Sequence, residues 1–250
     1  MCTVVILRRP GHEWPLLLAG NRDEMLARPW KPPARHWPDR PEVLAGLDET
    51  GGGSWLGIND HGVVATVLNR EHTLGPQAGK RSRGELVLDA LDHADAEAAA
   101  DALGHLDGRA YRPFNLLVAD NRDAFWLSLP ADGGRIRTHR VPDGLSVIAS
   151  TDLNDTHNPR TRFFRPLFQA AAIPDPDKDD WRAWQELLGC RIWDGDAGPR
   201  GAMCIVTDWG YGTGSSALVA LPSMQRSGAP PRVLFAAGRP DQTPFQPIDL

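Results

Sequence analysis

The second residue of the chain is a cysteine that could carry a nucleophile and its base together. Cys2 has a small side chain, so the initiator Met1 is expected to be removed, which leaves a thiol and a free α-amine on one residue. The amine titrates near about 7.7–8.0 and the thiol near about 8.5, so the amine can accept the thiol proton close to neutral pH. The chemistry this favours is nucleophilic attack on a carbonyl carbon. A cysteine in second position is usually incidental, so its surroundings decide whether this interpretation holds.

The residues that follow Cys2 are typical of a β-hairpin. Thr3–Leu7 and Leu16–Ala19 are rich in β-forming residues and flank a Pro-Gly pair at positions 10 and 11. The second strand runs straight into an Asn-Arg-Asp-Glu sequence at positions 21–24. Because a hairpin returns the end of its second strand beside the start of its first, this polar tetrapeptide is expected next to Cys2.

Strand alternation predicts how the tetrapeptide is oriented. Side chains two residues apart share a face of a strand, so Asn21 and Asp23 are predicted to point toward the thiol. Arg22 is then predicted to point away, unless a bulge at Gly20 changes its direction. An aspartate beside the α-amine would hold and orient that base. The alternative interpretation is a polar strand exit with an ion pair and no part in catalysis.

Asn69 is a third candidate, because its amide follows a strongly β-forming run, Val63–Leu68, where a core strand emerges. Oxyanion stabilisation needs a fixed N–H donor near the developing charge, and removing one such donor typically costs about 2.7–4 kcal/mol of transition-state stabilisation. Asn69 could be that donor. The alternative is a turn cap, and the residues alone do not choose between the two.

Two stretches of the sequence resemble known families. MCTVVILRR followed by LLLAGNRDE resembles the NRDE family, which includes the Transport and Golgi organisation protein 2 relatives, and this resemblance spans most of the chain. A second resemblance is carried by the stretch GINDHGVVATVLN, which is similar to a hairpin of the penicillin V acylase, bile salt hydrolase and acid ceramidase relatives. These relatives are N-terminal nucleophile (Ntn) hydrolases, and the resemblance to them covers roughly the first 70 residues. It implies that Cys2 attacks an amide, that Asp23 contacts it and that Asn69 helps to bind the oxyanion.

The resemblance leaves other positions without a clean counterpart. Those hydrolases usually carry an arginine a few positions before the aspartate, where this chain has Gly20, with Arg22 directly adjacent to Asp23. Their later substrate-side asparagine falls near Asp152 or Asn154. A further catalytic arginine has two nearby candidates, at positions 160 and 162.

Tryptophans are numerous, and several of them precede or follow the proposed site residues. The chain has nine, of which Trp55 and three others, Trp14, Trp30 and Trp37, could wall an apolar substrate pocket. For each of them core packing is the alternative. The eight histidines form no HxH, HExxH or Cys-His spacing, so no metal site is expected.

Composition excludes several functional classes. With 27 Lys and Arg against 32 Asp and Glu, the formal net charge of −5 disfavours nonspecific nucleic-acid binding. No apolar run approaches the roughly 20 residues that span a bilayer, and the amino terminus lacks the features of a signal peptide. Three cysteines are too few for a disulfide scaffold. A reducing, cytoplasmic location is therefore expected.

The predicted fold class is α+β, as a single domain over residues 1–250. Helix pairs are separated from runs of antiparallel strands, and the Ntn resemblance implies a four-layer αββα sandwich. A capping box at Ser82–Glu85 starts one helix, and Pro159 starts another. The segment 29–41, with five prolines, is predicted as an irregular surface loop. Gly210–Gly214 is predicted as a hairpin turn and Met203–Thr207 as a strand.

The expected function is a cysteine Ntn hydrolase that cleaves a non-peptide C–N (amide) bond, with Cys2 exposed by loss of Met1 and no cofactor. The alternative is a noncatalytic haem- or lipid-binding or trafficking protein on the same scaffold, in which Cys2 or a nearby histidine ligates haem iron. In both cases the partner is a small-molecule amide or an apolar ligand. Nucleic acid and membrane insertion are not expected, and the chain is predicted to be a monomer or homodimer.

Overall fold

The computed structural model describes residues 2–132, 134–226 and 228–250. The described chain divides into two compact units. The first unit comprises residues 2–28 and 142–249, and the second comprises residues 29–141 together with Leu250. The prediction of a single domain over the whole chain remains a prediction.

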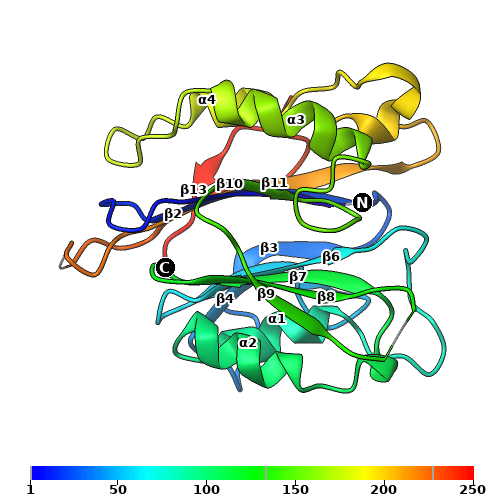
Figure 1. The fold of residues 1–250 in the computed structure, drawn as a ribbon, viewed down its shortest axis with the longest axis horizontal. Coiled ribbons are helices and arrows are strands. Elements are labelled where there is room, and N and C mark those ends of the chain that lie inside the picture. The colour runs from blue at the N-terminus through cyan, green and yellow to red at the C-terminus, as the bar shows by residue number, and fades with distance from the viewer. Residues whose placement is uncertain (1, 133, 227) are drawn as a thin grey trace. The chain divides into compact units, whose positions relative to one another are not determined.

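The first unit is built on a six-stranded antiparallel sheet (Figure 1). Its order is β10-β1-β2-β11-β12-β13, with β1 Thr3–Arg8, β2 Leu16–Met25, β10 Gly144–Ile148, β11 Tyr211–Leu221, β12 Arg232–Ala236 and β13 Gln246–Pro247. β1 is rich in β-branched residues and is buried at all six positions. The predicted first hairpin is confirmed, with Gly11 of the turn at a φ of 82° that glycine adopts without strain. β1 and β2 are thus central strands, each paired on both sides.

Two helices lie on one face of this sheet, α3 (Pro159–Ala170) and α4 (Arg182–Leu188), as Figure 1 shows. Their apolar side chains meet alternate residues of the strands in one core, which includes Val5, Leu17 and Phe164. Two short 3₁₀ turns, Gly195–Ala197 and Pro199–Gly201, follow α4 and lead back toward β11. One face of the six-stranded sheet is therefore the helix-covered face.

The second unit has a seven-stranded antiparallel sheet in the order β3-β4-β5-β6-β7-β8-β9. The strands are β3 Trp30–Ala34, β4 Val43–Asp48, β5 Leu56–Asn59, β6 Val64–Asn69, β7 Phe114–Ala119, β8 Ala124–Leu129 and β9 Arg137–Arg140. The helices are α1 Gly84–Leu91 and α2 Ala96–Gly104, and a 3₁₀ turn follows at Gly108–Ala110. α1 and α2 pack on this sheet around Leu86, Leu91 and Leu103. The capping box is partly made: the Glu85 carboxylate accepts from the Ser82 amide, while the Ser82 hydroxyl accepts from Gly84.

Three predicted segments differ from the structure. The proline-rich stretch 29–41 is not wholly a loop, because Trp30–Ala34 forms the edge strand β3, with an irregular register against β4 where its prolines cannot donate. Gly210–Gly214 is not a hairpin turn, since β11 already begins at Tyr211. Met203–Thr207 forms only an isolated bridge at Val206.

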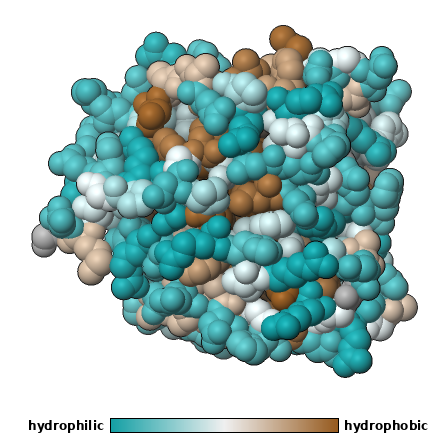
Figure 2. Space-filling model, in the orientation of Figure 1, coloured by the Kyte–Doolittle hydropathy of each residue, from teal (hydrophilic) through white to brown (hydrophobic). Residues whose placement is uncertain are grey.

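The surface of the described chain is mixed. The face drawn in Figure 2 is mostly hydrophilic, with hydrophobic areas between polar ones. None of the helices in the described residues is long and apolar enough to cross a membrane. Within the same residues, no group of three or more His, Cys, Asp or Glu side chains is arranged to hold a metal ion.

Candidate active site

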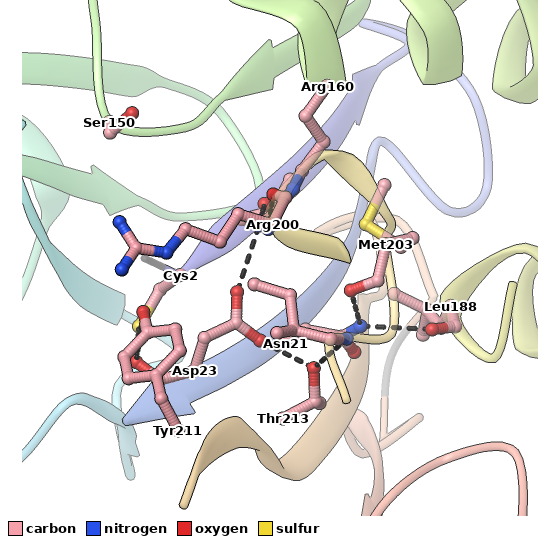
Figure 3. A network of polar contacts seen from close by, with 12 residues as sticks. Cys2, Asn21, Asp23, Ser150, Arg160, Leu188, Arg200, Met203, Tyr211 and Thr213 are labelled. Carbon is pink, nitrogen blue, oxygen red and sulfur yellow. Dashed lines mark hydrogen bonds and ion pairs between the residues drawn. The ribbon is translucent and has the colours of Figure 1, made fainter. Parts of the chain in front are cut away.

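A buried ion pair lies at the centre of the candidate site. Arg160 Nη1 is 2.9 Å from Asp23 Oδ2, and the two side chains are 4% and 0% exposed (Figure 3). The other carboxylate oxygen of Asp23 accepts from the Thr213 hydroxyl at 2.6 Å, and Arg160 Nη1 also donates to Thr3 Oγ1 at 2.5 Å. Burying two charges is costly unless both are paired and hydrogen-bonded, and here both conditions are met. The pair fixes the ends of β1, β2 and β11 to α3.

The start of α3 positions Arg160. Asn158 is the N-cap residue, and its side-chain oxygen accepts from the amides of Arg160 and Thr161, at 3.1 and 3.2 Å. Pro159 occupies the first turn, where its missing N–H costs nothing. The Asn158 amide nitrogen donates to Ser150 Oγ, which ties this cap to the end of β10. The predicted helix start at Pro159 is confirmed.

The Cys2 thiol contacts the main chain of Asp23. Its Sγ lies 3.8 Å from the Asp23 carbonyl oxygen, and the residue is half-buried. Burial raises the pKa of this thiol, the Asp23 carboxylate raises it further, and the Arg22 guanidinium lowers it; the net shift is upward. The thiol is therefore protonated at neutral pH and needs a base before it can attack a carbonyl group.

Arg22, rather than Asn21, shares the side of the sheet that carries the thiol. Thr3 and Asp23 both bond Arg160 on the helix-covered face, so alternation places Arg22 on the opposite face. The charge of Arg22 lowers the pKa of the Cys2 thiol, which directly precedes β1, so the two groups lie near each other. The prediction that Arg22 points away from the thiol is wrong. The bulge that occurs here is in β11, between Thr213 and Ser215, and not at Gly20.

The bulge lies beside Arg22. A Cβ built on Gly214 would lie 3.9 Å from Arg22 Nη1, at ordinary van der Waals distance, so the guanidinium lies next to the bulged backbone. Ser215 pairs with Arg22 in the register, and its buried hydroxyl has no hydrogen-bond partner among the described residues. Arg22 and Ser215 thus lie side by side on neighbouring strands, and Cys2 directly precedes β1.

The Asn21 side chain lies on the helix-covered face of the sheet and makes three hydrogen bonds there. Its amide nitrogen donates to the carbonyl oxygens of Leu188 at 3.0 Å and Met203 at 2.9 Å, and its oxygen accepts from the Ser216 hydroxyl. The prediction that the Asn21 side chain points toward the thiol is wrong, because these three partners lie on the helix-covered face of the sheet. The same prediction for Asp23 is also wrong for its carboxylate, which bonds Arg160 and Thr213, whereas the thiol contacts the Asp23 main-chain oxygen. Asn21 instead joins the end of α4 and the segment before β11 to β2.

Asn21→Ala is expected to destabilise the protein by about 2–4 kcal/mol, since it leaves two buried carbonyl groups and a hydroxyl without their partner. Denaturant unfolding followed by intrinsic tryptophan fluorescence measures this change. Asn121→Ala is the matched control, because Asn121 begins the same Asn-Arg-Asp sequence in the turn after β7. Equal losses in the two variants would contradict the role given to Asn21.

Two predicted site residues lie in the second unit. Asn69 ends β6, where it pairs with Phe114, and it is half-buried. Its side-chain amide makes no hydrogen bond to any residue that the structure describes, so it is available to a ligand. Trp55 packs edge-on against Trp30, with ring centroids 5.5 Å apart, and its ring covers Gly46, where a Cβ would approach it to 2.4 Å.

Asp152 and Asn154 follow β10 in the first unit, and they differ in environment. Asp152 is exposed. Asn154 has a φ of 59°, and its side chain accepts from the Val147 amide at 2.9 Å and donates to Ser146 Oγ at 3.1 Å. This amide is therefore occupied in holding the turn against β10.

Sequence reasoning missed most of the residues that surround Asp23. Arg160 was one of two candidates for a distant arginine, and the other, Arg162, pairs with Asp194 at the surface, 3.0 Å away. Tyr211 and Thr213 lay in the predicted turn, yet the Tyr211 hydroxyl donates to the Asp23 carbonyl oxygen at 3.3 Å. An alternating polar pattern in Tyr-Gly-Thr-Gly-Ser was the available signal for a strand there.

Comparison with known proteins gives a family and a fold. The family model described as "Transport and Golgi organisation 2" matches residues 1–189. The chain belongs to this family. Curated relatives include the human Transport and Golgi organization protein 2 homolog, 42% identical over 115 residues, and its Bos taurus counterpart, 41% identical over 115 residues. Each alignment covers 42% of this chain and 38% of the relative, so the match spans well under half of the curated proteins.

Solved structures resemble the chain over nearly its whole length. A Caenorhabditis elegans ortholog of N-acylethanolamine-hydrolyzing acid amidase has a TM-score of 0.57 and 13% identity, covering 99% of this chain and 100% of that one. Penicillin V acylase from Agrobacterium tumefaciens has a TM-score of 0.55 and 13% identity, and the match covers 94% of this chain and 83% of that one. A conjugated bile acid hydrolase from Clostridium perfringens has a TM-score of 0.54 and 10% identity, and the match covers 100% of this chain and 97% of that one. This member of the Transport and Golgi organisation 2 family therefore has the α+β, Ntn-hydrolase-like fold with two antiparallel sheets, and the predicted fold class is confirmed.

Proposed function

We propose that the chain is a cysteine Ntn hydrolase that cleaves a non-peptide amide bond, with Cys2 as the nucleophile after removal of Met1, which lies outside the described residues. The observation that carries the proposal is the contact of the Cys2 thiol with Asp23, whose carboxylate is paired with Arg160 in a buried network. The structural likeness to an amidase, an acylase and a hydrolase over nearly the whole chain supports the same reaction class.

The reaction needs a base because the pKa of the Cys2 thiol is raised by burial. The free α-amine takes the thiol proton as sulfur attacks the amide carbon, and the carbonyl π pair moves to oxygen. Collapse of the tetrahedral intermediate breaks the C–N bond, and the ammonium returns the proton to the leaving amine. Water then attacks the thioester with the amine again as base, which releases the carboxylic acid and restores the thiol.

The other site residues have separate proposed roles. Asp23 and its partners hold the end of β2, and with it the carbonyl oxygen that the thiol contacts. Asn69 is proposed to donate to the oxyanion, since its amide is free to do so. Arg22 is proposed to stabilise negative charge on the thiol-bearing face, and Trp55 and Asp152 are proposed to contact the substrate.

An acyl-trapping experiment tests the proposal. The p-nitrophenyl ester of a medium-chain fatty acid is expected to release one equivalent of p-nitrophenolate in a burst and to leave the acyl group on Cys2, located by peptide mapping after acid quench. Cys204 is the internal control, because burial, followed by the neighbouring Asp241 carboxylate, raises the pKa of its thiol to about 12. A protein that lacks Met1 and still gives no adduct at Cys2 would reject the hydrolase. A Soret band on haem titration of the same protein would instead favour the carrier hypothesis.

A further inference from the structure

A stack of one guanidinium and two aromatic rings lies beside the Asp23 network, in the first unit. Arg200 Cζ is 4.9 Å from the centroid of the Trp209 ring. That ring is stacked on Tyr211, with centroids 5.1 Å apart and an interplanar angle of 10°. Arg200 is exposed, and Trp209 is 47% exposed, although a large aromatic side chain is normally more deeply buried than that.

The stack connects directly to the nucleophile. The Tyr211 hydroxyl donates to the Asp23 carbonyl oxygen, which is the same atom that the Cys2 thiol contacts. The main-chain oxygen of Arg200 accepts from Arg160 Nη2 at 2.7 Å, so Arg160 fixes both Asp23 and the backbone that carries Arg200 (Figure 3). Arg160 therefore holds the backbone of Arg200 and also the Asp23 residue that the Cys2 thiol contacts.

Arg200 has no acidic partner within the described part of the chain. Among the residues that the structure describes, no Asp or Glu forms an ion pair with it, and its guanidinium donates no hydrogen bond to them. Several other arginines of the first unit pair with a carboxylate, as Arg162 does with Asp194 and Arg226 with Asp177. A guanidinium that lies over an indole ring can still present its fork of N–H donors to a carboxylate, which it binds through two parallel hydrogen bonds.

We infer that Arg200 on Trp209 is a substrate-recognition site for a carboxylate, so that the chain acts on anionic amides in preference to neutral ones. The inference rests on the proposed function, because it makes the stack part of the Cys2 site. The ion pair with the substrate forms at a partly exposed position, so the preference falls as ionic strength rises.

Binding to the Cys2→Ala protein separates recognition from turnover. The probes are N-dodecanoylglycine and N-dodecanoylethanolamine, which share an acyl chain and an amide and differ in a terminal carboxylate or hydroxymethyl group. Calorimetry at low salt is expected to show at least about tenfold tighter binding of the glycine conjugate. Arg200→Gln is expected to remove that preference and to change the affinity for the ethanolamide less than about twofold.

Arg182→Gln is the matched control, since Arg182 is an exposed arginine at the start of α4, in the same unit. Equal affinities for the two probes, no binding of either, or equal effects of Arg200→Gln and Arg182→Gln would each overturn the inference. Turnover assays of the wild-type protein distinguish the two proposals. A carboxylate preference in binding without acylation of Cys2 rejects the hydrolase and keeps the recognition site, whereas hydrolysis of both probes at equal rates keeps the hydrolase and rejects the site.

Discussion

Arg160→Met is expected to lower the free energy of unfolding by about 3–5 kcal/mol, which is the usual cost of breaking a buried ion pair by removing one partner. The loss is large because Asp23 is fully buried and would lose the guanidinium that balances its charge. The substitution also takes the donor from Thr3 and from the Arg200 carbonyl. Chemical denaturation at pH 7 measures the change.

The double variant Asp23→Asn with Arg160→Met separates the charge from the packing. Asparagine can still accept from Thr213, and no buried charge remains, so the double variant is expected to regain at least about 2 kcal/mol relative to Arg160→Met alone. Hydrolysis is expected to stay lost in both, because neither holds the end of β2 as the ion pair does. Additive losses of stability in the double variant would show that the two side chains are not coupled, and full activity in it would remove Asp23 from the mechanism.

The hairpin carries most of what the sequence alone predicts about this site. Thr3 pairs with Asn21, as expected from two β-forming runs joined by Pro-Gly, and this pairing brings Cys2 to Asp23. β7 and β8 are likewise joined by a short polar turn at residues 120–123. Contacts between neighbouring strands follow from local pattern, since a short loop fixes the register.

The orientation of the site did not follow from the hairpin alone. Which face of β2 meets the thiol depends on where α3 and β11 pack, and these elements come more than 130 residues later. Tyr211–Gly214 contains two glycines, which locally favours a turn, yet pairing with Asp23–Met25 makes it a bulged strand. Tertiary pairing overrides local preference here, and the resulting bulge lies beside Arg22.

Cys2→Ala is expected to lower kcat/KM for amide hydrolysis at least about 10³-fold, since no other group then supplies the nucleophile. Stability is expected to change by less than about 1 kcal/mol, because the thiol is half-buried and its contact with the Asp23 carbonyl oxygen is a long one of 3.8 Å. Steady-state rates and unfolding curves of the same preparation test the two statements together. Wild-type turnover by the alanine variant would end the hydrolase proposal.

Retention of Met1 should abolish hydrolysis as completely as loss of the sulfur, although the thiol is then still present. Burial raises the pKa of the Cys2 thiol, so it stays protonated at neutral pH, and an acylated nitrogen on that residue cannot remove the proton. Protein made in cells whose methionine aminopeptidase is inhibited is expected to be inactive. Its mass should exceed that of the trimmed protein by one methionine residue, about 131 Da. Treatment with purified aminopeptidase should then restore both the mass and the rate of hydrolysis. If the protein that keeps Met1 hydrolyses amides at the same rate as the trimmed one, the base is some other group, because a blocked nitrogen would then have no part in the proton transfer.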